Sequence, residues 1–532
     1  MGIIDRLIIS FSFLSSILPP NVVIILIISL FLSYKWLSKQ KAAKQFPLPP
    51  GPKSWPVVGC FPQMLRNKPV FRWMINLMAE MNTEIACFRL GGTNVISVTS
   101  PEVAREILKK QDTVFASRPT CMSAELASGN YLISLFSPLG DQWKKMRRVL
   151  TSHVLSPNTL NWLAHKRAVE ADHLVRYIYN QCRNAAGCGV VDVRAVGRHF
   201  CGNVIRQMVF SKRFFGAGTE DGGPGVEEEE HIDATFGVLA YVYSFGVSDY
   251  FPWLRMFDLD RHRKALKKGV EGVRKYQDPE VDERIRMWND GTKTEQEDIL
   301  DVLINLRCLT SEEIKAHLLE LMVTIVDNPS NAVEWVLAEM LNQPEILRRA
   351  MEELDNVVGR ERLVQESDLS KLNYLNACLK EVFRVHPLSA FVPPHLCSSD
   401  TTVSNYFIPK GSHVIISRHG LGRNPKNWEE PLRFKPERHL KNDGSEVSLV
   451  DPEVRVLTFS SGRRGCPGVQ LGSLVSGMLL GRILQGFEWS VPREMSGGRI
   501  DLKESKDSLL LAKPLNALAK PRLPHYVYSS LP

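Results

Sequence analysis

One cysteine, Cys466, lies in a glycine-rich loop directly ahead of an apolar run that predicts a helix. The loop reads Phe459-Ser-Ser-Gly462-Arg463-Arg464-Gly465-Cys466-Pro467-Gly468, and the apolar run extends from Val469 to Leu484. A thiolate that ligates a metal needs backbone N–H groups directed at its sulfur, and glycines next to a helix N-terminus provide them. A lone cysteine is usually a small buried core residue. This arrangement instead favours an axial ligand to the iron of a porphyrin, the thiolate that promotes O–O cleavage.

The same loop resembles the haem-binding loop of the cytochrome P450 superfamily. The superfamily pattern Phe-x-x-Gly-x-Arg-x-Cys-x-Gly is matched at its five fixed positions, Phe459, Gly462, Arg464, Cys466 and Gly468. The resemblance implies haem b as cofactor with Cys466 as iron ligand, and a mainly α-helical fold with small β-sheets. It also implies dioxygen as co-substrate and electrons from NADPH through a cytochrome reductase.

A long helix is predicted to begin at Thr310, because Thr310 and Glu313 form a capping-box pattern ahead of apolar residues at helical spacing. Within this helix lies Asp327-Asn328-Pro329. Proline has no N–H, so we expect a kink there, with the carbonyl of Ile325 left free for water or a ligand.

In the superfamily this position resembles the groove that holds dioxygen over the iron, where an acid precedes a threonine. Here the acid is Asp327, but Ile325 replaces a glycine and Asn328 replaces the threonine. An amide cannot pass a proton as a hydroxyl does. The resemblance therefore makes Asp327, Asn328 and Pro329 the catalytic candidates. It indicates either impaired oxygen activation or a site adapted to an unusual substrate.

The second interpretation is favoured by a narrower resemblance. Residues 328–335, Asn-Pro-Ser-Asn-Ala-Val-Glu-Trp, are similar to the plant amino-acid N-monooxygenases, and most similar to members that accept phenylalanine; segments 142–148, 435–439 and 461–466 resemble the same group. This implies that a hydrophobic L-amino acid, phenylalanine-like as the first expectation, is N-hydroxylated twice. Loss of water and carbon dioxide then leaves an aldoxime for glucosinolate or cyanogenic glucoside biosynthesis. A C-hydroxylating member of the superfamily and a non-catalytic haem-thiolate protein remain alternatives.

Four residues resemble the groups that meet the haem propionates. They are Trp143 and Arg147, four apart on a predicted helix, with Arg464 and His395. Propionates are anions whose burial is costly without cationic or donor partners. The resemblance therefore predicts that these residues, distant in sequence, converge on the cofactor.

A second set resembles the structural clamp behind the cysteine loop of the superfamily. Glu381 and Arg384 lie three apart, on one helix face, and can pair through two hydrogen bonds. Arg438 is the third candidate member. We expect a structural rather than a catalytic role.

Substrate specificity is expected from loops over the distal haem face. By resemblance these are residues 119–136, 244–257, 388–392 and 505–511, together with the kinked helix. Their apolar members indicate a pocket for an apolar side chain: Leu126, Leu132, Phe136, Phe251, Trp253, Phe391 and Leu509. For any one of these residues, ordinary core packing is the simpler interpretation. Ser330, Asn331 or Glu125 could bind the amine or carboxylate of the substrate. The Gly- and Glu-rich stretch 216–230 is predicted to be an exposed loop.

The N-terminus predicts a membrane anchor. Residues 19–37 are almost uninterruptedly apolar, about the length that spans a bilayer, and lysines follow them, which places the rest of the chain in the cytosol. A cleaved signal peptide is disfavoured because no small-residue cleavage site is present. We therefore expect residues 1–46 to form the anchor and its basic flank, 47–56 a proline-rich hinge, and 57–532 the haem-thiolate domain. The predicted location is the endoplasmic reticulum membrane, with one span.

Composition agrees with one large domain in a reducing compartment. The chain has 532 residues, of which 44% are hydrophobic, and its ten cysteines show no CxxC pairs. The net charge of +8 is dispersed, and no nucleic-acid-binding module is visible. A basic cluster at 144–148 and the pair Arg463-Arg464 indicate either a solvated face or a docking surface for an acidic electron donor.

Overall fold

The computed structural model describes residues 46–185, 189–441, 443–492 and 498–532. The predicted anchor, residues 1–46, lies outside this part except for its last residue. The chain divides into two compact units, one comprising Met1–Pro49 with Asp400–Ile408 and the other Pro50–Ser399 with Pro409–Pro532. No helix formed by the described residues is both long and apolar enough to cross a membrane.

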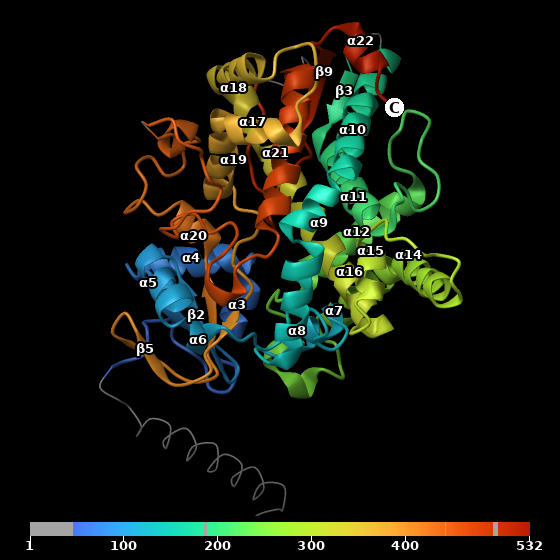
Figure 1. The fold of residues 1–532 in the computed structure, drawn as a ribbon. Helices are drawn as coiled ribbons and strands as arrows, with labels where there is room; N and C mark the ends of the chain where they lie inside the picture. The colour runs from blue at the N-terminus through green and yellow to red at the C-terminus, as the bar shows by residue number, and fades with distance from the viewer. Residues whose placement is uncertain (1–45, 186–188, 442, 493–497) are drawn as a thin grey trace, which may run out of the picture. The chain divides into compact units, whose positions relative to one another are not determined.

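Helices dominate the larger unit (Figure 1). The α-helices are α3 Phe61–Arg66, α4 Val70–Glu80, α5 Pro101–Arg105, α6 Asp112–Phe115, α7 Met122–Ala127, α8 Asp141–Val149, α9 Pro157–Trp162, α10 Ala164–Asn184, α11 Val193–Phe210, α12 Val226–Tyr241, α13 Val247–Tyr250, α14 His262–Asp290, α15 Ile299–Asn305, α16 Ser311–Ile325, α17 Asp327–Asn342, α18 Pro344–Val357, α19 Asn373–Val385, α20 Arg418–Gly422, α21 Val469–Gly486 and α22 His525–Ser529. Single turns of π-helix are η1 Glu106–Lys110 and η2 Leu150–Val154, and 3-10 turns are η3 Pro252–Leu254, η4 Glu366–Lys371, η5 Pro436–His439 and η6 Gly462–Arg464.

The sheets are small. In the larger unit, β1 Ile85–Leu90, β2 Thr93–Val98, β7 His413–Ile416 and β4 His395–Leu396 form a sheet in the order β1-β2-β7-β4. β2 and β7 are parallel, with Val95 opposite His413, and the other pairs are antiparallel. β3 Gly189–Asp192, β9 Asn516–Pro521 and β8 Phe487–Ser490 form an antiparallel sheet in the order β3-β9-β8. In the smaller unit, β5 Thr401–Val403 pairs with β6 Tyr406–Ile408.

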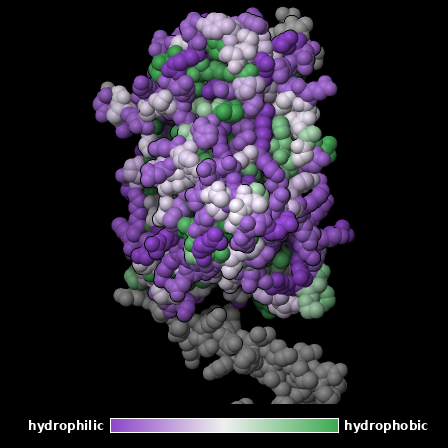
Figure 2. All heavy atoms as spheres, turned by 45° about the vertical axis from the view of Figure 1, so that its right-hand side comes forward, coloured by the Kyte–Doolittle hydropathy of each residue, from purple (hydrophilic) through white to green (hydrophobic). Residues whose placement is uncertain are grey.

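The main core surrounds α17, which packs against α11, α19 and α21. α17 is buried on every side from Pro329 to Leu341, and Trp335 heads the largest fully buried side chains. A helix that is covered all round in this way is a central helix. On the face drawn in Figure 2, hydrophilic side chains predominate and apolar ones lie in small separate patches.

The structure confirms the mainly helical fold with small sheets. Thr310 and Glu313 make both hydrogen bonds of the capping box at the start of α16, and α21 begins at Val469 as predicted. The prediction of an exposed loop at 216–230 is wrong at its end, because α12 begins at Val226 and Glu228 is fully buried. Glu228 pairs with Arg206 at 2.6 Å, a partner from α11 that no local pattern reveals.

Candidate active site

The loop that carries Cys466 is held in a tight turn directly ahead of α21. The N–H of Cys466 donates a hydrogen bond of 2.7 Å to the carbonyl of Phe459. Gly462 has a φ of +72°, and a Cβ there would lie 2.2 Å from the carbonyl oxygen of Leu108. Only glycine fits this position without displacing the backbone, which explains the glycine of the sequence pattern.

The Cys466 side chain is accessible although protein surrounds it. Its side chain is exposed, yet desolvation by the surrounding protein raises the pKa of the thiol. A hydrogen bond from the backbone of Gly468 and the positive charges of Arg418 and Arg147 oppose this rise and favour the thiolate. The loop therefore gives a ligating sulfur both a hydrogen bond and nearby positive charge.

Arg464 ties the cysteine loop to the segment between α7 and α8. It is buried, and its Nη1 and Nη2 donate to the carbonyl oxygens of Ser134 and Ser137 at 3.0 and 2.7 Å. Its guanidinium carbon lies 4.6 Å from the centre of the Trp143 ring, a cation–π contact. Arg147, one helical turn further along α8, donates to the carbonyl of Gly465 at 2.7 Å.

His395 belongs to the same cluster. Its Nδ1 donates to the carbonyl of Phe115 at 2.8 Å, while Nε2 is buried and has no hydrogen-bond partner within the described residues. Burial, with Arg118 and Arg464 nearby, lowers the pKa of His395 to about 3. An anion at Nε2 would raise this pKa again and keep the ring protonated. The structure thus brings together Trp143, Arg147, Arg464 and His395, and their contact with haem propionates stays a prediction.

Two further arginines of this cluster, Arg118, which is buried, and Arg418, which is half-buried, were not predicted. Arg118 donates to the carbonyls of Leu135, Pro393 and Pro394, and Arg418 donates to those of Leu457 and Thr458. Burial lowers the pKa of each arginine to about 10, and that of Arg464 to about 9. Arg118 directly precedes the predicted specificity loop at 119–136, but its local sequence carries no spacing that marks it. Only the fold reveals both residues.

The arginine cluster fits a haem. Among the described residues, no ion pair joins Arg118, Arg147, Arg418 or Arg464 to a carboxylate. Cations shielded from solvent without a partner are costly, and the two propionates of a haem would provide the missing negative charge. Cys466 would hold the iron, and the haem, when bound, supplies the binding and activation of dioxygen.

The central helix breaks close to the predicted kink. α16 ends at Ile325 and α17 begins two residues later. Side chains bind carbonyl groups on either side of the break: Nδ2 of Asn328 donates to Thr324 at 3.0 Å, and Oγ of Ser330 donates to Val326 at 2.9 Å. These two carbonyls each have a side-chain partner, and the amide of Asn328 has a backbone partner.

Asp327 faces α11. Asn331 donates a short hydrogen bond to its carboxylate, and the charges of Arg198 and Arg194, both on α11, act on it. Desolvation nevertheless outweighs these groups and raises the pKa of Asp327 to about 6. Asp327 can thus hold a proton at mildly acidic pH, which a carboxyl group in water would not do.

Glu381, Arg384 and Arg438 lie together as the sequence indicates. Arg384 donates to both carboxylate oxygens of Glu381 at 2.8 Å, and Arg438 donates at 3.0 Å. His439 adds a bond of 2.7 Å that was not predicted. Burial alone would raise the pKa of Glu381, but the hydrogen bonds from Arg384 and His439 lower it to about 2. The group is a complete buried ion network.

Three residues considered as substrate contacts are engaged elsewhere. Glu125 pairs with Arg255 at 3.0 and 3.2 Å. Asn331 donates to Asp327. Ser330 packs against α11, so closely that a Cβ added to Gly197 would lie 3.1 Å from the Cβ of Ser330. Glu125 and Ser330 are thus occupied within the protein, whereas Oδ1 of Asn331 is buried and has no hydrogen-bond partner within the described residues, so Asn331 keeps a free acceptor.

Two of the apolar residues expected in the pocket also lie elsewhere. Trp253 is 69% exposed, and Phe251 is buried against Phe61, edge-on with ring centres 5.0 Å apart. Phe136 and Leu509 are buried as expected. Periodicity and hydrophobicity could not distinguish these outcomes, because they do not show which neighbour covers a loop residue.

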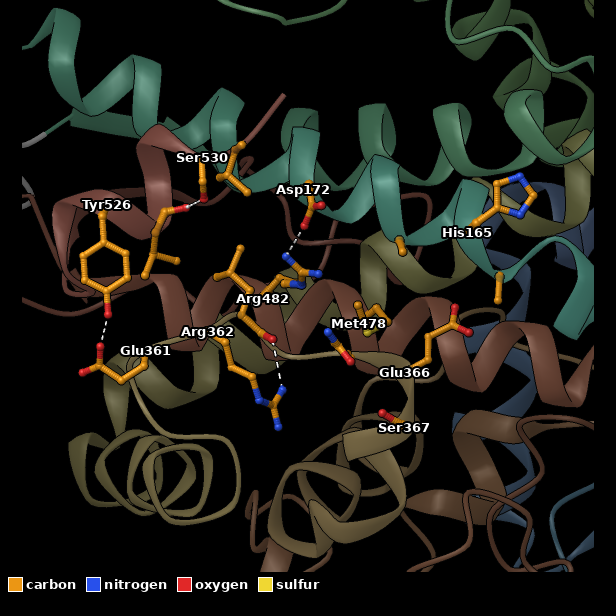
Figure 3. A pocket seen from close by; sticks show the side chains of 16 residues that line it. His165, Asp172, Glu361, Arg362, Glu366, Ser367, Met478, Arg482, Tyr526 and Ser530 are labelled. Atoms are coloured by element: carbon orange, nitrogen blue, oxygen red, sulfur yellow. Dashed lines mark hydrogen bonds and ion pairs between the residues drawn. The ribbon is translucent and has the colours of Figure 1, made fainter.

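A wide pocket of about 610 Å³ occurs outside this cluster (Figure 3). α10, the segment 361–367, α21 and α22 contribute its walls, where Arg482 donates to Asp172 at 2.7 Å and Tyr526 donates to Glu361. Its residues on α21, Met478 and Arg482, come more than two turns after the start of that helix. None of the residues that surround Cys466 lines this pocket, so it is not the oxidation site.

The chain is similar to known proteins over most of its length. The family model described as Cytochrome P450 matches residues 49–519. The chain is 54% identical to isoleucine N-monooxygenase 1 of Lotus japonicus, over 91% of this chain and 92% of that protein. It is 54% identical to tyrosine N-monooxygenase of Sorghum bicolor, over 91% and 88%, and 51% identical to phenylalanine N-monooxygenase of Arabidopsis thaliana, over 96% and 99%. The chain therefore belongs to the cytochrome P450 family and, within it, to the amino-acid N-monooxygenases.

Proposed function

We propose that this protein converts a hydrophobic L-amino acid to its aldoxime. The observation that carries the proposal is an identity of about half of all residues, over nearly the whole chain, to enzymes named for the N-monooxygenation of isoleucine, tyrosine and phenylalanine. All three names state an N-monooxygenation, and they differ in the side chain of the amino acid that is named. Phenylalanine is our first expectation for the substrate.

The reaction balances as two N-hydroxylations followed by an elimination. Each hydroxylation consumes one dioxygen and two electrons and releases one water. The N,N-dihydroxy amino acid then loses carbon dioxide and a third water, which leaves R–CH=NOH. NADPH supplies four electrons in all, through a reductase.

The chain's own residues provide the setting for this chemistry. The Gly468 backbone and the charges of Arg147 and Arg418 favour the thiolate form of Cys466, against the desolvation that raises the pKa of its thiol. Asp327 provides a carboxyl group that can hold a proton near pH 6, next to the helix break. Asn328 stands where most of the superfamily has a threonine, and its bond to Thr324 fixes its amide. We propose that this substitution adapts the site to an amine nitrogen.

Electron supply and location are part of the same proposal. Lys144, Arg148 and Arg463 are exposed close to the cysteine loop and suit an acidic electron donor. Residues 1–46 would anchor the protein in the endoplasmic reticulum membrane, with the haem domain in the cytosol. Exposed Trp253, Met256 and Phe257 supply apolar surface suited to lipid.

The test is reconstitution of the full chain with a plant NADPH reductase in lipid vesicles, followed by aldoxime analysis with each protein amino acid. We expect aldoxime from one or a few hydrophobic amino acids. Cys466→Ser should give none and should lack the red-shifted Soret band of reduced, carbon monoxide-bound haem-thiolate. A hydroxylated carbon product with retained amine would instead support C-hydroxylation. No product from any amino acid, with an intact haem-thiolate spectrum, would contradict the proposal.

A further inference from the structure

Glu320 of α16 is a buried carboxylate that faces the segment between α7 and α8. It is 5% exposed. Its Oε1 accepts hydrogen bonds from the Ser134 hydroxyl at 2.9 Å and the Leu135 N–H at 2.8 Å, and its Oε2 accepts from the Ser134 N–H at 3.2 Å. A carboxylate with three such donors holds a short stretch of backbone firmly.

The opposite side of the same two residues is bound to the cofactor cluster. The carbonyl of Ser134 accepts from Nη1 of Arg464 at 3.0 Å, and the carbonyl of Leu135 accepts from Nε of Arg118 at 3.2 Å. Ser134 and Leu135 thus each connect Glu320, on the central helix, to an arginine of the cluster, and the peptide group between them binds Glu320 through its N–H and Arg464 through its carbonyl. Arg464 stands two residues before Cys466, so the connection crosses from the central helix to the cysteine loop.

Glu320 also contributes charge. Its carboxylate is separated from the guanidinium groups of Arg464 and Arg118 by single residues, Ser134 and Leu135. Among the described residues, the cluster has no direct carboxylate partner. Glu320 is therefore a negative group that these arginines experience without forming an ion pair with it.

We propose that Glu320 is a positioning residue for the haem. Through Ser134 and Leu135 it sets the guanidinium groups of Arg464 and Arg118 at the edge of the cofactor, and its charge keeps the reduction potential of the iron lower than the arginines alone would. The proposal requires a haem on Cys466 but no particular amino-acid substrate, so its outcome is independent of the proposed function.

Three variants of the full-length protein separate contact from charge. Glu320→Gln keeps the shape and removes the charge, Glu320→Asp keeps the charge and shortens the reach, and Ser134→Ala removes one hydrogen bond. Glu312→Gln is the matched control, because Glu312 lies on α16 but is 59% exposed and pairs with Arg274. The measurements are the redox potential by spectroelectrochemistry and the rate of haem transfer to excess apomyoglobin.

We expect Glu320→Gln to shift the potential to a more positive value, while Glu320→Asp and Glu312→Gln stay close to the parent. Haem transfer should become about tenfold faster in Glu320→Asp and Ser134→Ala, as for the loss of a hydrogen bond to a charged group.

Equal potentials in Glu320→Gln and Glu312→Gln would overturn the electrostatic role. Unchanged haem transfer in Glu320→Asp and Ser134→Ala would overturn the positioning role. If Glu320→Gln fails to fold, Glu320→Asp and Ser134→Ala still decide the positioning role. Glu320→Asp then also tests the charge: a reduction potential equal to that of the parent, together with faster haem transfer, supports the electrostatic role.

Discussion

Two groups of wholly or partly buried charged residues are built in opposite ways. Both carboxylate oxygens of Glu381 have direct partners within the protein, in Arg384, Arg438 and His439. Arg118, Arg147, Arg418 and Arg464 hydrogen-bond only to backbone carbonyls or to a hydroxyl, and none forms an ion pair with a carboxylate among the described residues. One network is complete in the protein, and the other requires an anion from outside.

The pKa values express this difference. In the complete network, hydrogen bonds overcome burial and hold the pKa of Glu381 at about 2. In the incomplete one, burial prevails and lowers the pKa of Arg464 to about 9. A buried charge that the fold has satisfied serves stability, whereas one left unsatisfied indicates a ligand. The contrast favours a cofactor site at the arginine cluster.

The largest effect should follow from breaking the complete network. Glu381→Ala leaves two buried guanidinium groups without a carboxylate, which costs about 3–5 kcal/mol. We expect loss of most folded protein, measured by urea denaturation and yield. The control is Glu345→Ala, because Glu345 pairs with Arg348 at the same i, i+3 spacing on α18 but is 84% exposed. That change should cost less than about 0.5 kcal/mol; equal losses in the two variants would contradict the contrast.

Breaking the incomplete network should affect the cofactor rather than the fold. Arg147→Leu removes a cation whose hydrogen bond goes to the carbonyl of Gly465. We expect haem affinity to fall by about 1.5–3 kcal/mol, tenfold or more, while the unfolding free energy of the apoprotein changes by less than about 1 kcal/mol. Haem titration and apoprotein denaturation measure the two quantities. Arg147→Lys should recover part of the affinity, and an apoprotein as destabilised as Glu381→Ala would refute the distinction.

Asp327 extends the comparison to a buried acid that is only partly satisfied. Its folded pKa of about 6 lies above the ordinary value of 3.8, so the folded state binds the proton more tightly than the unfolded state does. The stability from this proton is fully present below about pH 4 and is lost as the pH rises through about 6. Asp327→Asn should therefore add about 2 kcal/mol of stability at pH 8 and almost none at pH 4.

The same change should reduce aldoxime formation, because the amide no longer titrates. Denaturation curves at pH 4 and pH 8, with activity at pH 8, provide the check. A stability gain equal at both pH values would show that the carboxyl group is not desolvated as described. The change in the free energy of unfolding has the opposite sign for the two acids. At pH 8, neutralising Glu381 destabilises the protein, whereas neutralising Asp327 stabilises it.

Local patterns predicted much of the fold and part of the site. The capping box at Thr310, the start of α21 and the Glu381–Arg384 pair all depend on residues within four positions of each other. Partners that meet across long stretches of chain were not predicted, because periodicity has no information about them. Arg118, Arg418 and Glu320 are of this kind. Trp253 was misplaced for the same reason, since an apolar residue in a loop does not reveal what covers it.

The smallest expected effect is that of Asn328→Thr. A threonine hydroxyl in a helix can bind the carbonyl four residues earlier, so it can replace the bond from Asn328 to Thr324. Stability should change by less than about 0.5 kcal/mol, and haem content should stay the same.

The new hydroxyl adds a proton donor at the helix break, and we expect less aldoxime per NADPH consumed. The ratio of aldoxime to NADPH at saturating amino acid measures this. An unchanged ratio would mean that Asn328 acts only as a helix cap, and that the adaptation to an amine nitrogen lies in other residues of the distal side.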